Sequence, residues 1–346
     1  MIQIVSTRRS EGGAGLVATL LRFLYDKETP APHNEAVYRG FLEEIELFGI
    51  ASQVLTALQQ SGKTDQVPED FVRRLKRYAE PGRFRNIRIQ WFERQLFRIF
   101  EQANIPVVPL KGIQFAANYF GHFTARSTGD IDLLVRPEQL QDAIEWLKAF
   151  GYRHEETIHN HAVLRKAVDG APLVELHWTL DKPGWSELDP EPFWRDSAPL
   201  GQFRFVRELS VTHTFYAICL HGVRHRMESL RYLLDIAQML YRFGSSIDYA
   251  ELFAQAAADR TVNRLKAALS IVYRVFPKLD QLKPLPFEPR RTLWSYPAIR
   301  DARLRVKSVR YYKYRLYFKL FIFDTWKHGW HARRRITSKY SEYSTN

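Results

Sequence analysis

Two acidic residues, Asp130 and Asp132, begin a short hydrophobic run that ends at Val135. Such a run is typical of a buried β-strand, in which alternate side chains point to the same face of the sheet. Two carboxylates this close repel each other and lose hydration, so we expect a cation between them. Oxygen ligands on a rigid strand suit Mg²⁺. The pair therefore predicts a magnesium site on one face of a sheet.

Two other segments carry residues that suit the same site. Upstream, the apolar residues 107–110 predict a strand that ends in a turn made by Lys111 and Gly112. Downstream, Glu175 lies inside a second apolar strand, followed by His177 and Trp178. A third acid on a neighbouring strand would complete a set of three carboxylates, with a lysine at the adjacent turn.

The pattern of elements around these residues predicts three regions. Residues 1–100 have helical periodicity, residues 101–207 alternate between strand and helix patterns, and residues 208–346 return to helical periodicity. The central region predicts a small mixed sheet with helices on one side. Its expected elements are a strand at 106–110, a helix at 112–120, a strand at 131–135, a helix from Pro137 to Gly151, and strands at 161–168 and 173–179 joined by an Asp169-Gly170 hairpin turn.

These motifs resemble one known family, the uncharacterised bacterial nucleotidyltransferases of the polymerase-beta-like superfamily. The resemblance covers roughly residues 100–245. It is carried by Leu110-Lys111-Gly112, Arg126, Gly129–Val135, Gly151-Tyr152, Glu175–Trp178, and the helical segment from Leu220-His221-Gly222 to Leu234–Ala237.

The resemblance implies an α+β enzyme, with a small mixed-sheet nucleotidyltransferase core between helical N- and C-terminal regions. It would transfer a nucleoside monophosphate from a nucleoside triphosphate, for example ATP, to an unknown hydroxyl or phosphate acceptor, with release of pyrophosphate. Two Mg²⁺ ions would stabilise the two ends of the displacement. Asp130, Asp132 and Glu175 would be both catalytic residues and metal ligands.

The same resemblance implies a binding site for the triphosphate. Lys111 and Arg126 would neutralise phosphate charge, and Gly112 would let the backbone approach the phosphates closely. Superfamily members commonly have Gly-Ser at this turn, closer in sequence to the acids. Here the turn is Lys-Gly, so the serine contact is missing, and the sequence leaves open how the triphosphate is held and which nucleotide is used.

Several polar residues also have ordinary structural interpretations. Arg126 could pair with an acid, and His177 is more often a packed strand residue than a ligand. His221 and His225, four apart on a helix, lack a third ligand in a zinc-type pattern and are interpreted as core or second-site residues. Arg231 and Asp235, also four apart, predict an ion pair within a helix.

The chain is strongly basic, with a net charge of +13, which favours anionic partners. Residues 301–340 hold twelve Lys or Arg against two Asp. Within this tail, aromatic and basic residues alternate over 311–319, and Arg333–Arg335 follow. Such a segment could bind nucleic acid, could lie on a membrane surface, or could be a terminal helix that packs its aromatic face on the domain.

The remaining features predict a cytoplasmic protein, with a peripheral position at the membrane as an alternative. Cys219 is the only cysteine, so no disulfide framework can form, and no stretch is apolar for long enough to span a bilayer. Two alternative functions stay open at this stage. One is a non-catalytic nucleotide-binding or regulatory protein of the same fold, and the other is an RNA-terminal transferase, suggested only by the basic tail.

Overall fold

The structure, a computed structural model, describes residues 16–341, with side chains described as far as Arg333. Its central feature is a five-stranded sheet with strand order β1-β2-β5-β4-β3. Strands β2 and β5 are parallel and the other neighbours are antiparallel, which confirms the mixed sheet. The strands are β1 (Val107–Pro109), β2 (Asp130–Val135), β3 (Tyr152–Ile158), β4 (His161–Lys166) and β5 (Leu173–His177).

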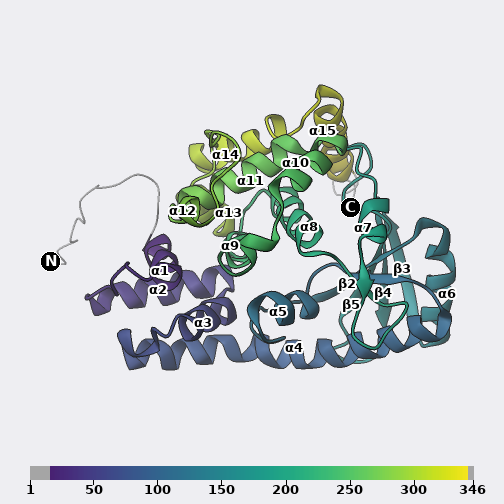
Figure 1. Cartoon of the computed structure of the whole chain (residues 1–346), viewed down its shortest axis with the longest axis horizontal. Helices are drawn as coiled ribbons and strands as arrows, with labels where there is room; N and C mark the ends of the chain where they lie inside the picture. Colours follow the sequence, from purple (N-terminus) through teal and green to yellow (C-terminus); the bar gives the residue numbers. More distant parts are fainter. Residues whose placement is uncertain (1–15, 342–346) are drawn as a thin grey trace.

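Helices precede and follow the sheet in the chain, as the sequence predicts (Figure 1). Before the first strand are α1 (Leu16–Tyr25), α2 (Glu35–Phe48), α3 (Ala51–Gln60) and α4 (Glu69–Ala103). Between the strands are α5 (Ile113–Phe120) and α6 (Leu140–Ala149). After the sheet come α7 (Glu191–Arg195), a two-stranded ribbon of β6 (Ala198–Pro199) and β7 (Arg207–Glu208), then α8 (Val211–Arg224), α9 (Leu230–Phe243), α10 (Tyr249–Ala258), α11 (Val262–Val275), α12 (Leu279–Leu282), α13 (Tyr296–Arg303), α14 (Val309–Leu320) and α15 (Trp326–Ser341).

Helix α4 joins the helical and sheet regions (Figure 1). It has 35 residues, a length of about 52 Å, and begins at Glu69 with two acids that favour the N-terminal end of the helix dipole. Its first half packs Phe71 and Leu75 into a core shared with the other helices. Its second half packs Phe92 and Leu96 into a separate core under the sheet. The same helix therefore contributes to both hydrophobic cores.

The alternation of side chains along β2 separates the two cores. Ile131, Leu133 and Val135 point into the core that contains α4 and α6. Leu134 points the other way, into the core that contains the C-terminal helices. The sheet consequently has helical partners on both faces, and not on one side as the sequence analysis expects. The second face is the one that carries Asp132.

Strand β3 is the strand of the five-stranded sheet that the sequence analysis missed. Residues 153–157 are all exposed, so this edge strand lacks the alternating apolar residues that reveal a strand. It forms through its antiparallel pairing with β4. Its charged side chains lie at the edge of the sheet, where they discourage pairing with other chains. The predicted hairpin after β4 does form, and Gly170 there has a φ of 71°, which favours glycine.

The aromatic side chains of the basic tail are divided between the core and the surface. In α14, Tyr314, Tyr317 and Phe318 are buried in the core, and the hydroxyl of Tyr314 donates a hydrogen bond to the carbonyl of Arg226 at 2.8 Å. This agrees with the packed-helix alternative, whereas a membrane or nucleic-acid partner gains no support. Among the described helices, none has the length and apolarity needed to cross a bilayer. The side chains of Arg334 and Arg335 lie outside the described residues.

Candidate active site

The three predicted acids lie on adjacent parallel strands. Asp132 on β2 is directly opposite Glu175 on β5, and Asp130 is two residues before Asp132. A single lysine, Lys111, reaches both aspartates, with Nζ 2.9 Å from Asp132 Oδ2 and 3.6 Å from Asp130 Oδ2. Both aspartate side chains therefore leave the same face of β2. The structure brings the acids and the lysine together as one cluster.

The turn between β1 and α5 positions Lys111. The backbone N–H of Leu110 donates to the carbonyl of Asp132 at 3.0 Å, which fixes the turn beside β2. Gly112 follows with a φ of 80° and a ψ of −129°, a conformation that a residue with a Cβ rarely adopts. Glycine is required here by the backbone angle, because a Cβ would meet only ordinary contacts with Thr128 and Asp130. The turn thereby directs the lysine side chain over the carboxylates.

A buried asparagine on α4 orders the loop that leads into β2. The side-chain amide of Asn86 donates to the carbonyls of Phe123 and Arg126, both at 2.7 Å. Its side-chain oxygen accepts from the N–H of Thr128 at 3.0 Å. These bonds connect α4 to the two ends of the segment just before Asp130. The carboxylates are thus positioned by a rigid strand and by a loop attached to the longest helix.

His177 extends the cluster beyond the predicted residues. Its Nε2 lies 3.1 Å from Asp132 Oδ1 and 3.2 Å from Glu175 Oε2. The side-chain amide of Asn160 lies 3.4 Å from Nδ1. Burial alone would lower the pKa of His177, but its hydrogen bonds to Asp132 and Glu175 raise it, so Nε2 carries a proton directed at the two carboxylates. His177 is therefore a buried strand residue, as the sequence analysis favoured, but one that links two of the three acids.

Charge and burial set the protonation of the cluster. Burial alone would raise the pKa of Asp132, but Lys111 and His177 hold it well below its usual range. Burial and repulsion by Asp132 raise the pKa of Asp130. The pKa of Lys111 is raised by the two aspartates, which outweigh its burial. Asp132 is thus a permanent anion beside a permanent cation, as a stable pair in a dry site requires.

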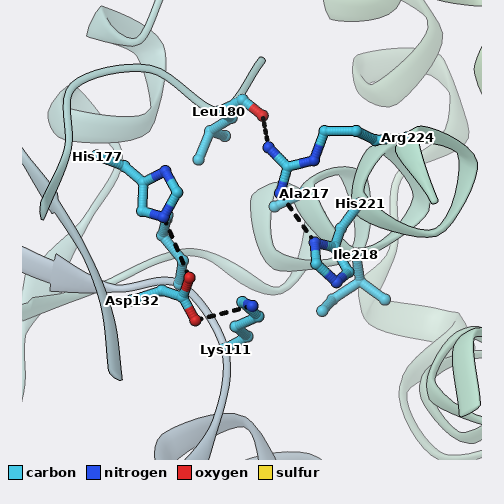
Figure 2. A pocket seen from close by; sticks show the side chains of 9 residues that line it. Lys111, Asp132, His177, Leu180, Ala217, Ile218, His221 and Arg224 are labelled. Atoms are coloured by element: carbon cyan, nitrogen blue, oxygen red, sulfur yellow. Dashed lines mark hydrogen bonds and ion pairs between the residues drawn. The ribbon is translucent and has the colours of Figure 1, made fainter. Parts of the chain in front are cut away.

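The opposite wall of the site comes from α8, shown close up in Figure 2. Arg224 and His221 face Asp132 and Lys111 across a cavity of about 30 Å³, which also contacts His177. Nη2 of Arg224 lies 3.1 Å from Nδ1 of His221, and its Nη1 donates to the carbonyl of Leu180 at 3.4 Å. Burial and the charges of Lys111 and Arg224 keep the pKa of His221 well below its usual value, so this ring is neutral.

Two residues in this wall were not assigned to the site from sequence. Arg224 carried no sequence signal beyond its place near the end of the Leu220-His221-Gly222 helix. His221 was interpreted as a core or second-site residue, because spacing alone cannot show what a helix faces. His225, the other member of that pair, stacks on Tyr232 with ring centroids 5.7 Å apart, and its pKa is lowered by burial to about 3.

Arg126 lies apart from the carboxylate cluster. Its side chain is 4% exposed, and its Nε and Nη2 donate to both oxygens of Asp235 at 2.8 to 3.0 Å. Asp235 therefore pairs with Arg126 and not with Arg231, whose guanidinium instead donates to the carbonyl of Gly49. The predicted ion pair within α9 is wrong. The structural alternative for Arg126, a pair with an acid, describes the contacts that it makes.

The donor atoms of the cluster suit a divalent cation. Asp132 Oδ2 is buried and accepts no aligned hydrogen bond, although Lys111 is close to it, so this oxygen retains a free lone pair. Carboxylate oxygens of three acids are the ligands that Mg²⁺ prefers. Among the described residues near this site, His161, Glu175 and His177 form the group whose ligand atoms all lie within 4.8 Å of one another, and Asp130 and Asp132 are not part of it. The chemical types of these donor atoms suit a divalent cation, and Glu175 is common to this group and to the acidic cluster.

Comparison with known proteins identifies the family. The sequence model of a family described as uncharacterised nucleotidyltransferase matches residues 39–277, which include the acidic cluster, Lys111 and α8. The chain belongs to this family. It is therefore a nucleotidyltransferase, as the resemblance of its motifs indicated. The match extends well upstream of residue 100 and includes most of the N-terminal helical region.

Similarity to solved structures is partial. The solution structure of the antibiotic-resistance factor ANT(2″)-Ia is 14% identical and has a TM-score of 0.34, over 48% of this chain and 87% of that one. The crystal structure of ANT(2″)-Ia in complex with adenylyl-2″-tobramycin is 14% identical with a TM-score of 0.31, over 48% of this chain and 94% of that one. No curated protein matches the chain.

Proposed function

We propose that this nucleotidyltransferase moves a nucleoside monophosphate from a Mg²⁺-bound nucleoside triphosphate to a hydroxyl or phosphate oxygen of a small acceptor. The observation that carries the proposal is the cluster of Asp130, Asp132 and Glu175 on one sheet face, with Lys111 and Arg224 beside it. Three acids suit the metal, and two cations suit a triphosphate. A non-catalytic nucleotide-binding protein would need no third acid at this position.

The metal would be held by Asp130, Asp132 and Glu175. When bound, Mg²⁺ would neutralise charge on the phosphates and on the attacking oxygen. Lys111 and Arg224 would supply fixed positive charge to the phosphates, in a site with little water to weaken it. The side chain of Glu175 is 23% exposed, and it would accept the proton of an attacking hydroxyl. Since His177 donates to both Glu175 and Asp132, it would hold these two carboxylates in fixed orientations.

The bond changes follow from this arrangement. The acceptor oxygen forms a bond to the α-phosphorus, while the bond from that phosphorus to the oxygen bridging the α- and β-phosphates breaks. Pyrophosphate leaves with the electron pair. The proton of a hydroxyl acceptor goes to Glu175, whereas an ionised phosphate acceptor has no proton to lose. Arg126 takes no part in this scheme, because its guanidinium is bound to Asp235.

The test uses nucleotides labelled at the α-phosphate, incubated with Mg²⁺ and a small-molecule extract. ATP, GTP, CTP and UTP are compared for pyrophosphate release and for transfer of label. Asp130→Asn and Asp132→Asn should each lower transfer by at least about a hundredfold, because neutral amides hold the metal and the phosphate charge poorly. Glu175→Gln should lower turnover more than nucleotide affinity. Asp142→Asn, at an exposed site on α6, is the matched control and should retain activity.

Melting curves of the same variants separate catalysis from folding. Asp132→Asn should lower the melting temperature, because it removes the negative charge that pairs with buried Lys111. It also removes one of the two carboxylates that contact Nε2 of His177. A folded Asp132→Asn protein that transfers nucleotide at the wild-type rate would overturn the proposed mechanism. Nucleotide binding without transfer to any acceptor in the extract would instead favour the regulatory alternative.

A further inference from the structure

A second and larger hollow lies next to the candidate active site. It encloses about 680 Å³ between α14, the end of α8, Trp185, and the segment that joins α14 to α15. Arg224 lines both this groove and the small cavity beside Asp132. We call the larger hollow the α14 groove. Arg224 is therefore common to the α14 groove and to the cavity beside Asp132.

The lining of the α14 groove is strongly basic. None of the described residues that line it is acidic. Among the ion pairs in the described part of the chain, none involves Lys307, Lys313 or Lys319, whereas Arg226 of the same lining pairs with Glu228 at 2.8 Å. The basic residues of the lining are Arg224, Arg226, Lys307, Lys313, Arg315 and Lys319.

Aromatic side chains accompany these charges. Tyr311, Tyr312, Trp185 and Phe323 line the same groove. Tyr312 is 56% exposed although it lies on the same helix as the fully buried Tyr314. Aromatic faces stack on rings, while Lys and Arg bind phosphate oxygens. The groove thus combines recognition of an anionic group with recognition of a ring.

We propose that the α14 groove binds the acceptor, and that the acceptor is a small phosphorylated ring compound such as a sugar phosphate. This inference rests on the nucleotidyl transfer proposed above. Arg224 would contact the acceptor from the groove side and the triphosphate from the cavity side, and so hold the two reactants together. A phosphorylated ring compound carries an oxygen that can attack the α-phosphorus, either from a hydroxyl or from its phosphate.

The shape of the groove favours a small molecule over a polymer or a bilayer. A volume of about 680 Å³ lies within the usual range of roughly 300 to 1,000 Å³ for small-ligand sites. A membrane-binding face needs no concave surface. It also gains nothing from lying beside Arg224, which lines the cavity of the candidate active site. Single-stranded nucleic acid would require a basic track that continues past the groove. Both remain as outcomes of the test.

The test measures binding of 1-anilinonaphthalene-8-sulfonate, a fluorescent aromatic anion, to the full chain without nucleotide. Glucose 1-phosphate, a twelve-residue oligothymidylate and vesicles of phosphatidylglycerol then compete with it. The groove variant is Lys313→Glu with Lys319→Glu. The control variant is Arg77→Glu with Arg98→Glu, at exposed positions on α4, which makes the same change in net charge on another helix.

The groove variant should weaken probe binding and competition by glucose 1-phosphate by at least about tenfold, whereas the control variant should bind as wild type does. Tyr312→Ala should also weaken probe binding. Equal binding by the groove and control variants, or displacement by oligonucleotide or vesicles far better than by glucose 1-phosphate, would overturn the assignment. The Asp132→Asn variant should bind the probe normally. If the wild type transfers no nucleotide while the groove variant still loses the probe, the proposed function fails and the groove remains a binding site.

Discussion

Lys111 provides the positive charge that two adjacent aspartates require when they are buried together. Its Nζ lies within 3.6 Å of both carboxylates, so the repulsion expected from their spacing is already compensated by the chain itself. A divalent cation entering the cluster must therefore compete with Lys111 for Asp132. In the proposed function, Lys111 would exchange these contacts for phosphate oxygens when nucleotide binds.

A second buried acid, Glu93, leads to a prediction on pH and stability. Glu93 is 2% exposed on α4 and accepts a hydrogen bond from Gln114 at 2.6 Å. Burial raises its pKa from 4.5 to about 8, against the smaller effects of Gln114 and Arg94. The folded protein therefore holds a proton that the unfolded chain releases above pH 4.5. Stability from this group is complete below that pH, falls as the pH rises from about 4.5 to about 8, and changes little above that.

Glu93→Gln should remove this loss, because a neutral amide has no proton to release. The variant should melt at a higher temperature than wild type near pH 8, by an amount corresponding to a few kcal/mol, and the two curves should converge near pH 4.5. Melting curves between pH 4.5 and 9 measure the difference. Glu80→Gln, at an exposed site on the same helix, is the control. A constant offset at every pH would contradict the titration of Glu93.

At the scale of elements, the buried pair of Arg126 and Asp235 attaches the loop before β2 to α9. Arg126→Ala and Asp235→Ala should each cost about 3–5 kcal/mol, because each leaves a buried charge without a partner. Since the two residues share one interaction, the double variant should cost less than the sum. Arg231→Ala, which removes the partner expected from sequence, should cost less than either. Urea unfolding measures all four variants.

Nucleotide affinity distinguishes the two roles considered for Arg126. If this arginine only attaches the loop to α9, a folded Arg126→Ala variant should bind nucleotide nearly as wild type does. A large loss of affinity with little loss of stability would instead support phosphate binding by Arg126. Titration of a fluorescent nucleotide below the melting temperature of the variant provides the comparison.

Two tyrosines of α14 test whether this helix packs on the body of the protein. Tyr314 is fully buried and Tyr312 is 56% exposed on the same helix. Tyr314→Ala should lower the unfolding free energy by about 3–5 kcal/mol, the usual cost of removing a buried aromatic ring. Tyr312→Ala should change it by about 0.5 kcal/mol or less. Equal melting temperatures for the two variants would contradict the packing of α14 on the body of the protein.

The elements that sequence predicts well are those whose side chains alternate or recur. The apolar run after Asp130 predicted β2 almost to the residue. Strand β3 was missed because its exposed residues are polar on both faces. Local sequence placed the acids and Lys111 beside one another, but it could not show that Arg224 faces them. Arg224 lines the same cavity as Lys111 and Asp132, and only the packing of α8 beside the sheet brings these distant parts of the chain together.

At the scale of the whole molecule, the candidate site lies where two hydrophobic cores meet. One face of β2 belongs to the core under the sheet, and the other belongs to the core of the C-terminal helices. The cavity between Asp132 and Arg224 is only about 30 Å³, room for about a water molecule and far too small for a nucleotide. Nucleotide must therefore lie partly outside this cavity, or α8 and the sheet must separate to admit it.

Ligand binding at this boundary should stabilise the whole chain. Mg²⁺ alone should raise the melting temperature only slightly, because it must displace Lys111 from Asp132. Mg²⁺ with a bound nucleoside triphosphate should raise it more, since the phosphates give Lys111 and Arg224 new partners, with a gain of about 2.7 kcal/mol when the ligand is at a hundred times its dissociation constant.

Hydrogen exchange identifies which part of the molecule responds. With Mg²⁺ and nucleotide, amide exchange should slow in α8 as well as in β2 and the Lys111 turn, because the ligand contacts both walls of the site. In Asp132→Asn these changes should be lost, whereas the exposed Asp142→Asn variant should show them as wild type does. Protection confined to the sheet, with α8 unchanged, would mean that the nucleotide binds without Arg224. The catalytic role of α8 would then be wrong, even if the acidic cluster still held the metal.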